Sequence, residues 1–180
     1  GGGSGLTQLS GTTGAAGTSG ITTQFLTADA AAITVTTPTV VMTTTNLPVG
    51  TYKFTYMIRY RSAATTTGIG VAVNFTGTNS YWVQTSRFVT TGGAAATGIA
   101  DQVAAVNAGQ LMEGKSERVK NTVSSSTAGV DTVNADMFMT VEGMFTCSTI
   151  GNLELKIRTE IAASGITVMS GTNLELVDFG

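Results

Sequence analysis

The sequence predicts an all-β fold, an antiparallel β-sandwich, for most of its length. From residue 24 onward the dominant hydropathy period is two, which places successive side chains on opposite faces of a strand. Segments rich in Gly, Ser, Asn and Thr separate these alternating stretches and supply turns. Several strands joined by such turns are typical of a sandwich or a barrel.

The clearest strand is expected at residues 51–61, after a turn formed by Pro48 and Gly50. One face of this strand is apolar and mostly aromatic, and the other face is polar except for Met57. The apolar face consists of Tyr52, Phe54, Tyr56, Ile58 and Tyr60. The same alternation predicts strands at 69–75, 135–147 and 153–161, with Ile161 on the apolar face of the last. Weaker patterns predict strands near 31–36, 39–45, 81–90, 164–169 and 172–179.

Two segments fall outside this alternation. Residues 1–23 consist mainly of Gly, Ser and Thr, which predicts a flexible linker or extended arm before a domain of residues 24–180. Residues 92–130 are expected to form a long exposed loop, where partner contacts often lie. Within this loop, residues 100–108 are compatible with a short helix that ends at Gly109.

Charge is scarce in this chain. Charged residues make up 11% of the 180 residues, whereas about 25% is usual for a soluble domain. A free monomer normally keeps a well-charged surface, so the composition favours a surface largely buried against other subunits. The alternative is a soluble monomer with a threonine-rich surface.

The distribution of charge and apolar residues also bears on partners. The net charge is −2 and the basic residues form no stripe, so no nucleic-acid partner is expected. No apolar run approaches the ~20 residues of a membrane helix, so no membrane partner is expected.

Catalytic chemistry has little support in the residue types. The chain has no His, the usual general base and the commonest metal ligand. Glu154 and Glu160 share a strand face but lie about 20 Å apart, too far for glycoside cleavage, and Asp136 and Glu142 fail by the same spacing. Carboxylates from different strands remain an alternative. Cys147 stands alone, which excludes an internal disulfide and a cysteine-based zinc site and favours a small core residue. We therefore expect no enzyme activity and no cofactor.

Four residues are candidate subunit contacts: Phe138, Met144, Tyr81 and Trp82. Phe138 and Met144 fall on the strand face that also carries Asp136 and Glu142, and two large apolar groups on a polar face suggest a contact. The alternative is that sheet twist or a bulge covers them. Tyr81 and Trp82 point to opposite faces, so one is expected in the core and the other as a subunit anchor or a sugar-stacking platform.

A series of short motifs carries a family resemblance. In chain order they are Val49–Phe54, Val141–Gly143, Gly151–Leu155, Ile166–Val168 and Ser170–Leu176. Over roughly residues 30–179, without 92–130, the chain resembles jelly-roll domains of phage head decoration, fibre and tail proteins. Those domains are similar to the trimeric globular heads of complement and tumour necrosis factor proteins.

The resemblance implies a specific fold and function. The fold is a jelly roll, and the protein is a virion structural protein, a capsid decoration or cement protein or a fibre head that forms a homotrimer. Its partners would be copies of itself and major capsid or fibre proteins. The alternative is a receptor- or glycan-binding tip of a tail or fibre that contacts a host surface glycan. A hydrolase acting through cross-strand carboxylates is the third hypothesis.

Overall fold

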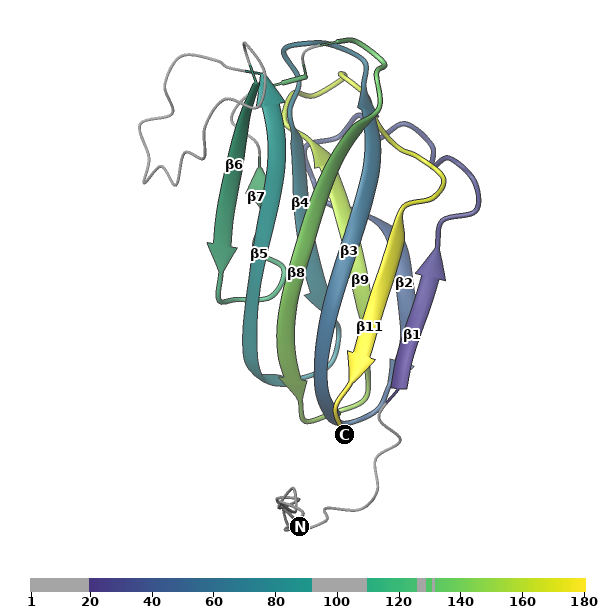
Figure 1. The fold of residues 1–180 in the computed structure, drawn as a ribbon, viewed down its shortest axis with the longest axis vertical. Coiled ribbons are helices and arrows are strands. Elements are labelled where there is room, and N and C mark those ends of the chain that lie inside the picture. The colour runs from purple at the N-terminus through teal and green to yellow at the C-terminus, as the bar shows by residue number, and fades with distance from the viewer. Residues whose placement is uncertain (1–19, 92–109, 126–128, 131) are drawn as a thin grey trace, which may run out of the picture.

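The chain folds into two antiparallel β-sheets that pack face to face (Figure 1). The structure is a computed structural model, and it describes residues 20–91, 110–125, 129–130 and 132–180. Every regular element in these ranges is a strand. An all-β antiparallel sandwich, as the alternation predicted, is therefore confirmed.

The larger sheet has seven strands. Six follow the order β1 (Gly20–Phe25), β11 (Asn173–Asp178), β3 (Gly50–Ser62), β8 (Met137–Cys147), β5 (Asn79–Thr91) and β6 (Gln110–Glu117). The seventh, β10 (Ile166–Val168), pairs with the end of β3. The smaller sheet has the order β2 (Thr39–Leu47), β9 (Gly151–Thr159), β4 (Ile69–Phe75) and β7 (Ser124–Ser125).

The strand pairs between β2 and β9 are nested. β2 pairs with β9, β3 with β8, β4 with β7, and β5 with β6, all antiparallel. This is the pattern of one long hairpin, closed at the β5–β6 connection and folded over so that its pairs alternate between the two sheets. The strands β11 and β1 then extend the larger sheet beyond β3.

The core between the sheets is aromatic. The ring of Phe145 lies 5.2 Å from Tyr52, 5.1 Å from Phe75 and 5.3 Å from Trp82, measured between ring centroids. These distances are typical of favourable aromatic pairs. Phe75 belongs to β4 in the smaller sheet, so the cluster joins the two layers.

The strong strand predictions at 51–61, 69–75, 135–147 and 153–161 correspond to β3, β4, β8 and β9. Ile161 was expected on the apolar face, but it lies in the turn after β9 and is exposed. Weaker predictions correspond to β2, β5, β10 and β11. The strand predicted at 31–36 is wrong: only Ile33 forms an isolated bridge, with Ile166. The amide of Thr159 and that of Ala163 bond to Val35 and Thr34, so this segment crosses a turn instead of following one strand.

Two predicted boundaries also need correction. The arm predicted over residues 1–23 is wrong for residues 20–23, which pair with β11 as part of β1, and residues 1–19 lie outside the described residues. The loop predicted over 92–130 is wrong for residues 110–117, which pair with β5 as β6, and for Ser124–Ser125, which pair with β4 as β7. Residues 92–109 of that prediction lie outside the described residues. The helix predicted at 100–108 lies outside the described residues. Lys120 was expected in an exposed loop, but its ammonium group donates to the carbonyls of Phe75 and Gly77 and caps the edge of β4.

Candidate subunit interface

The outer face of the larger sheet carries an unusual number of large apolar side chains. We use "outer face" for the side chains of β1, β11, β3, β8 and β5 that alternate with the core residues and point away from the smaller sheet. Its exposed large hydrophobic residues are Ile21, Phe25, Met57, Tyr81, Phe138 and Met144. Gln24 bonds to Thr43 and Thr44 of β2, so it faces the smaller sheet and its neighbour Phe25 faces outward.

The smaller sheet presents a different surface to solvent. Lys156 pairs with Glu154 at 3.3 Å, and Glu154 also accepts a hydrogen bond from Asn74. A Cβ atom added at Gly70 would lie 2.7 Å from the side chain of Arg158, so the arginine stem covers this glycine. The aliphatic stems of long charged residues thus cover the apolar surface here. The outer face of the larger sheet has no such cover over its large apolar groups.

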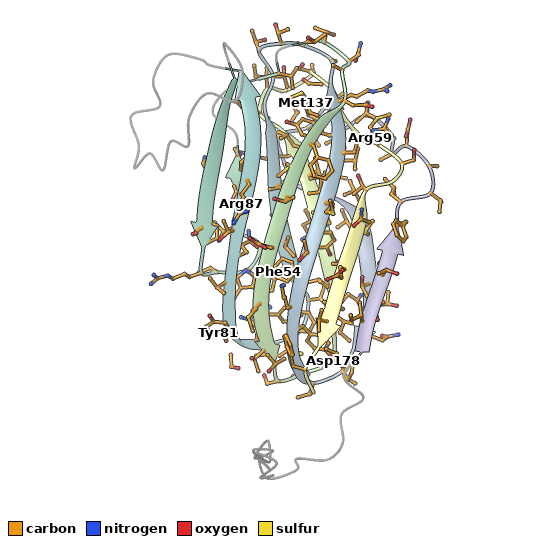
Figure 2. All side chains as sticks on the ribbon, viewed as in Figure 1. Phe54, Arg59, Tyr81, Arg87, Met137 and Asp178 are labelled. Atoms are coloured by element: carbon orange, nitrogen blue, oxygen red, sulfur yellow. The ribbon has the colours of Figure 1, made fainter. Side chains whose placement is uncertain are left out.

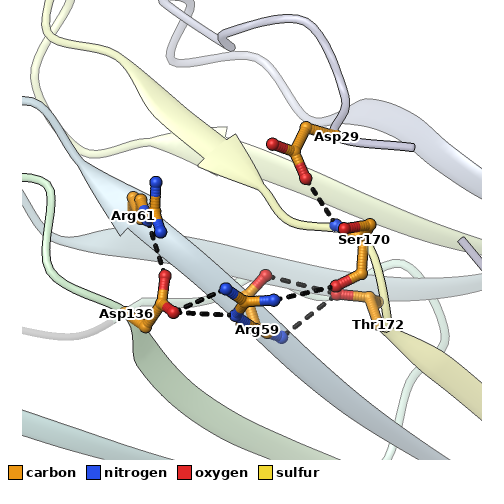
Figure 3. Close-up of polar contacts among 6 residues, drawn as sticks. All are labelled: Asp29, Arg59, Arg61, Asp136, Ser170 and Thr172. Carbon is orange, nitrogen blue, oxygen red and sulfur yellow. Dashed lines mark hydrogen bonds and ion pairs between the residues drawn. The ribbon is translucent and has the colours of Figure 1, made fainter. Parts of the chain in front are cut away.

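Most charges of the outer face are paired within it. Asp136 bonds to both Arg59 and Arg61 at 2.6 Å (Figure 3), and Arg87 pairs with Glu142 at 3.1 Å. Hydrogen bonds from Arg61 and then Arg59 lower the pKa of the Asp136 carboxyl. All these side chains are partly exposed, so each pair contributes little to stability by itself. Together with the carboxylate of Asp29, whose charge acts on Arg61, they balance the charge of this part of the face.

Two charges of the outer face are left over. Lys53 and Glu175 make no ion pair with any residue that the structure describes. They lie on adjacent strands, because Lys53 of β3 is opposite Val177 and Glu175 of β11 is opposite Thr55. The outer face therefore carries one free positive and one free negative group next to each other.

The upper end of the face is held by bonds to the chain between β10 and β11 (Figure 3). The amide of Arg59 donates to the hydroxyl of Thr172 at 3.1 Å, and this hydroxyl donates to the carbonyl of Arg59 at 3.2 Å. The carboxylate of Asp29 accepts from the amide of Ser170 at 2.8 Å, which lowers the pKa of Asp29. These bonds fix the path of the chain where β10 ends and β11 begins.

A shallow hollow lies in the middle of the outer face. It has a volume of about 220 Å³ and is lined by Lys53, Val83, Gln84, Thr85, Glu142, Gly143 and Met144. Gln84 and Gly143 are opposite each other in the ladder and contribute the floor. Tyr81 lies two residues before Val83 on the same face, near the lower end of β5 in Figure 2. The hollow thus has an exposed aromatic ring close to its rim.

Two of the four predicted contact residues lie where the alternation places them. The side chains of Phe138 and Met144 are 47% and 38% exposed on the outer face. β8 pairs with β3 without a register shift over Met137–Cys147. The alternative explanation, that twist or a bulge covers these two side chains, is therefore wrong. Their role as subunit contacts remains a prediction.

The prediction of Trp82 as a candidate subunit contact is wrong. It is 4% exposed and packs against Phe54 at 5.5 Å and Phe145 at 5.3 Å between ring centroids, so it is a core residue and not a surface contact. Its indole N–H donates to Gln84 Oε1 at 3.3 Å. Tyr81 is the outward member of the pair and is 52% exposed. Parity showed that these neighbours face opposite ways, and only the packing of the two sheets decided which one is inside.

Sequence reasoning did not single out Ile21, Phe25, Lys53 and Glu175 as members of the face. Ile21 fell within the predicted arm, and the pairing of β1 with β11 could not be seen from composition. Met57 had a visible signal, because it interrupted the polar side of its strand. The structure places Met57 on the outer face, where it is 41% exposed.

The cysteine and the carboxylates that were weighed as catalytic or metal-binding groups lie apart from one another among the described residues. Cys147 is buried, as expected of a small core residue, and burial raises the pKa of its thiol. Glu160 accepts a bond from the amide of Gly68, away from the Glu154 pair. In the described ranges no three His, Cys, Asp or Glu residues gather as metal ligands would. The same ranges contain no helix with the length and apolar character needed to cross a membrane.

Comparison of the chain with protein-family models, curated proteins and solved structures gave no match.

Proposed function

We propose that this chain is a jelly-roll structural module that self-associates within a phage particle. The nested strand pairs support the fold assignment, because a jelly roll is a double-sheet arrangement of eight strands built from two Greek keys. Strands β2 to β9 supply eight strands in two sheets with that nesting. The added strands β1, β10 and β11 all join the larger sheet.

The observation that carries the self-association is the outer face of the larger sheet. Phe138, Met144 and Met57 stand exposed on a face whose arginines are paired with its own carboxylates. Several large apolar groups exposed on one face of a sheet favour an interaction site there. Depletion of free charge is a further feature of interface cores. The low charge of the whole chain favours the same conclusion.

The place of the module in a particle follows from the resemblance of its motifs. Head decoration or cement proteins and fibre heads are the candidates, with a homotrimer as the assembly and the virion as the location. Major capsid or fibre proteins are then the further partners. Fold alone does not distinguish these roles, because one architecture serves many functions.

The oligomeric state tests this proposal directly. Mass spectrometry in native buffer at micromolar concentration is expected to give a multiple of the 18.3 kDa chain mass, and the motif resemblance implies three copies. A stable monomer over the whole concentration range would overturn the self-association. Electron microscopy of the intact particle then locates the module, and its absence from purified particles would overturn the virion assignment.

A glycan-binding tip is the second candidate function. Tyr81 lies beside the hollow that Lys53, Thr85 and Glu142 line with polar groups, and an exposed ring next to hydrogen-bonding groups suits a sugar. A glycan array is the first measurement, and Tyr81→Ala should abolish any signal whereas Tyr81→Phe keeps the ring. An array without a hit, or a signal that survives Tyr81→Ala, contradicts this function.

A further inference from the structure

We propose that two copies of the chain meet through the outer face of the larger sheet, with Lys53 of each copy paired to Glu175 of the other. This inference rests on the self-association proposed above and names the contact that it uses. Because the contact is reciprocal, it has two-fold symmetry and closes at two copies, in place of the three that the motif resemblance implies. The occupant of the face is a second copy of this chain. Three features of the face support that choice: its area, its charges and the residues around the two free charges.

The face has the area that a stable contact needs. The strands β3, β5 and β8 are 11 to 13 residues long, and β1 and β11 have six residues each. With ~3.3 Å per residue and ~4.8 Å between strands, the five strands cover roughly 750 Å². A standard stable interface buries about 800 Å² per partner. The face of one copy therefore offers about the area that a stable contact with a second copy buries.

The charges of the face complement those of an identical face. The Arg87–Glu142 pair is neutral within each copy, and Asp136 together with the nearby Asp29 balances the two charges of Arg59 and Arg61. Among the residues of the face that the structure describes, Lys53 and Glu175 remain, with opposite signs on neighbouring strands. Two such faces can meet about a two-fold axis that lies between them. Each lysine can then lie opposite the glutamate of the partner copy. A face with one free sign alone would repel its own copy.

Apolar residues flank Lys53 on both neighbouring strands, whereas threonines lie opposite Glu175. Met144 is directly across the ladder from Lys53, and Val177 is opposite Lys53 on the other side. Ile21 of β1 is in turn opposite Val177. Neighbours of this kind exclude water when a second copy covers them, and charge pairs desolvated in this way discriminate strongly between matched and mismatched partners.

Charge reversal tests the pairing. Lys53→Glu leaves two free negative charges on each face, and Glu175→Lys leaves two free positive charges. Each variant alone is expected to self-associate about tenfold more weakly than the original chain in sedimentation experiments, because like charges then face each other. Mixing the two variants in equal amounts is expected to recover association, since every free charge of one variant then meets its opposite on the other.

The mixing step separates this contact from a pair formed inside one copy. An intramolecular Lys53–Glu175 pair is broken in both variants, and mixing would not restore it. Arg118→Glu changes the charge by the same amount at an exposed residue beyond the end of β6, and it should leave association unchanged. Phe138→Lys, on the same face, should weaken association, and mixing it with either charge-reversal variant should not restore the association. Circular dichroism checks that each variant is folded.

A closed assembly of three copies would overturn the inference, since a reciprocal contact closes at two. Two further results would also overturn it while leaving the proposed function standing. In the first, the original chain associates but Lys53→Glu, Glu175→Lys and Phe138→Lys associate equally well, so the contact lies elsewhere. In the second, the two reversed variants weaken association but mixing recovers nothing, so the charges do not pair between copies. A monomeric original chain would instead contradict the self-association itself, and the inference with it.

Discussion

The hydroxyl of Thr172 holds the backbone of Arg59 at both of its polar groups, since it accepts from the amide at 3.1 Å and donates to the carbonyl at 3.2 Å. Thr172 is fully buried. It stands where β10 has ended and β11 has not begun, so β3 lacks a strand partner at this point on the side away from β8. One side chain thus replaces the missing strand residue, and the guanidinium of Arg59 remains aimed at Asp136.

Thr172→Val is expected to destabilise the fold. The substitution keeps the shape of the side chain but leaves the amide of Arg59 without its partner, whereas the carbonyl of Arg59 still accepts from the amide of Met169 at 2.8 Å. A buried unsatisfied polar group costs about 1 to 3 kcal/mol, so the urea midpoint of unfolding should fall clearly. Thr172→Ser keeps the hydroxyl and should lose much less. Equal losses for Val and Ser would show that the methyl group and not the hydroxyl matters.

Gly143→Ala is expected to destabilise the sandwich through overcrowding. A Cβ atom at this position would lie 2.4 Å from the carbonyl oxygen of Val83 and 2.5 Å from Cζ of Phe54. Because the first neighbour is backbone, the strand itself must shift, and overpacking of this kind typically costs about 1 to 3 kcal/mol. Gly114→Ala is the matched control, since nothing lies within 4 Å of its added atom. Chemical denaturation of both variants measures the difference, and equal stabilities would contradict the packing described around Phe54.

The Asp136 carboxylate is expected to contribute stability that depends on pH. Its folded pKa is lowered by hydrogen bonds from Arg61 and Arg59, whereas an unfolded aspartate titrates near about 3.9. The contribution is therefore complete above the unfolded pKa and is lost as the pH falls through the lower folded pKa. Asp136→Asn should unfold more easily than the original chain at pH 7, and this gap should close below about pH 4. A gap that stays constant across the acid range would mean that charge is not its cause.

The thiol of Cys147 is expected to be unreactive in the folded chain. Its sulfur is buried, it donates to the carbonyl of Pro48 at 3.2 Å, and burial raises its pKa. Only the thiolate attacks disulfide reagents, so labelling should be slow in buffer and fast in urea. Tyr81→Cys adds an exposed thiol and should label with one fast and one slow phase. Fast labelling of the original chain would show that the end of β8 opens readily.

Local sequence pattern predicted much of the fold because side-chain parity is a local property. Each residue of β3 between Tyr52 and Tyr60 faces the side that the alternation assigned to it, and the same holds for Phe138 and Met144 in β8. The pattern failed where neighbours in space are distant in the chain. Residues 110–117 form β6 only because β5 lies beside them, and their own composition resembles a loop.

The candidate site needed the three-dimensional arrangement even more. Composition showed that charge was scarce, but not which charges would pair. Lys53 and Glu175 are 122 positions apart, and the pairing of β3 with β11 alone makes them neighbours. The choice between Tyr81 and Trp82 also lay beyond parity, because it depends on which side of β5 the smaller sheet covers.

By itself, the amino-acid order determined that the chain forms alternating strands, which residues share a face, and that few ionised groups are available to keep a surface in water. Only the tertiary structure decided the nested strand order, the burial of Trp82 and the isolation of two opposite charges on one exposed face. The physical reason is that alternation acts between adjacent residues, whereas register and burial are set by contacts between strands far apart in the chain.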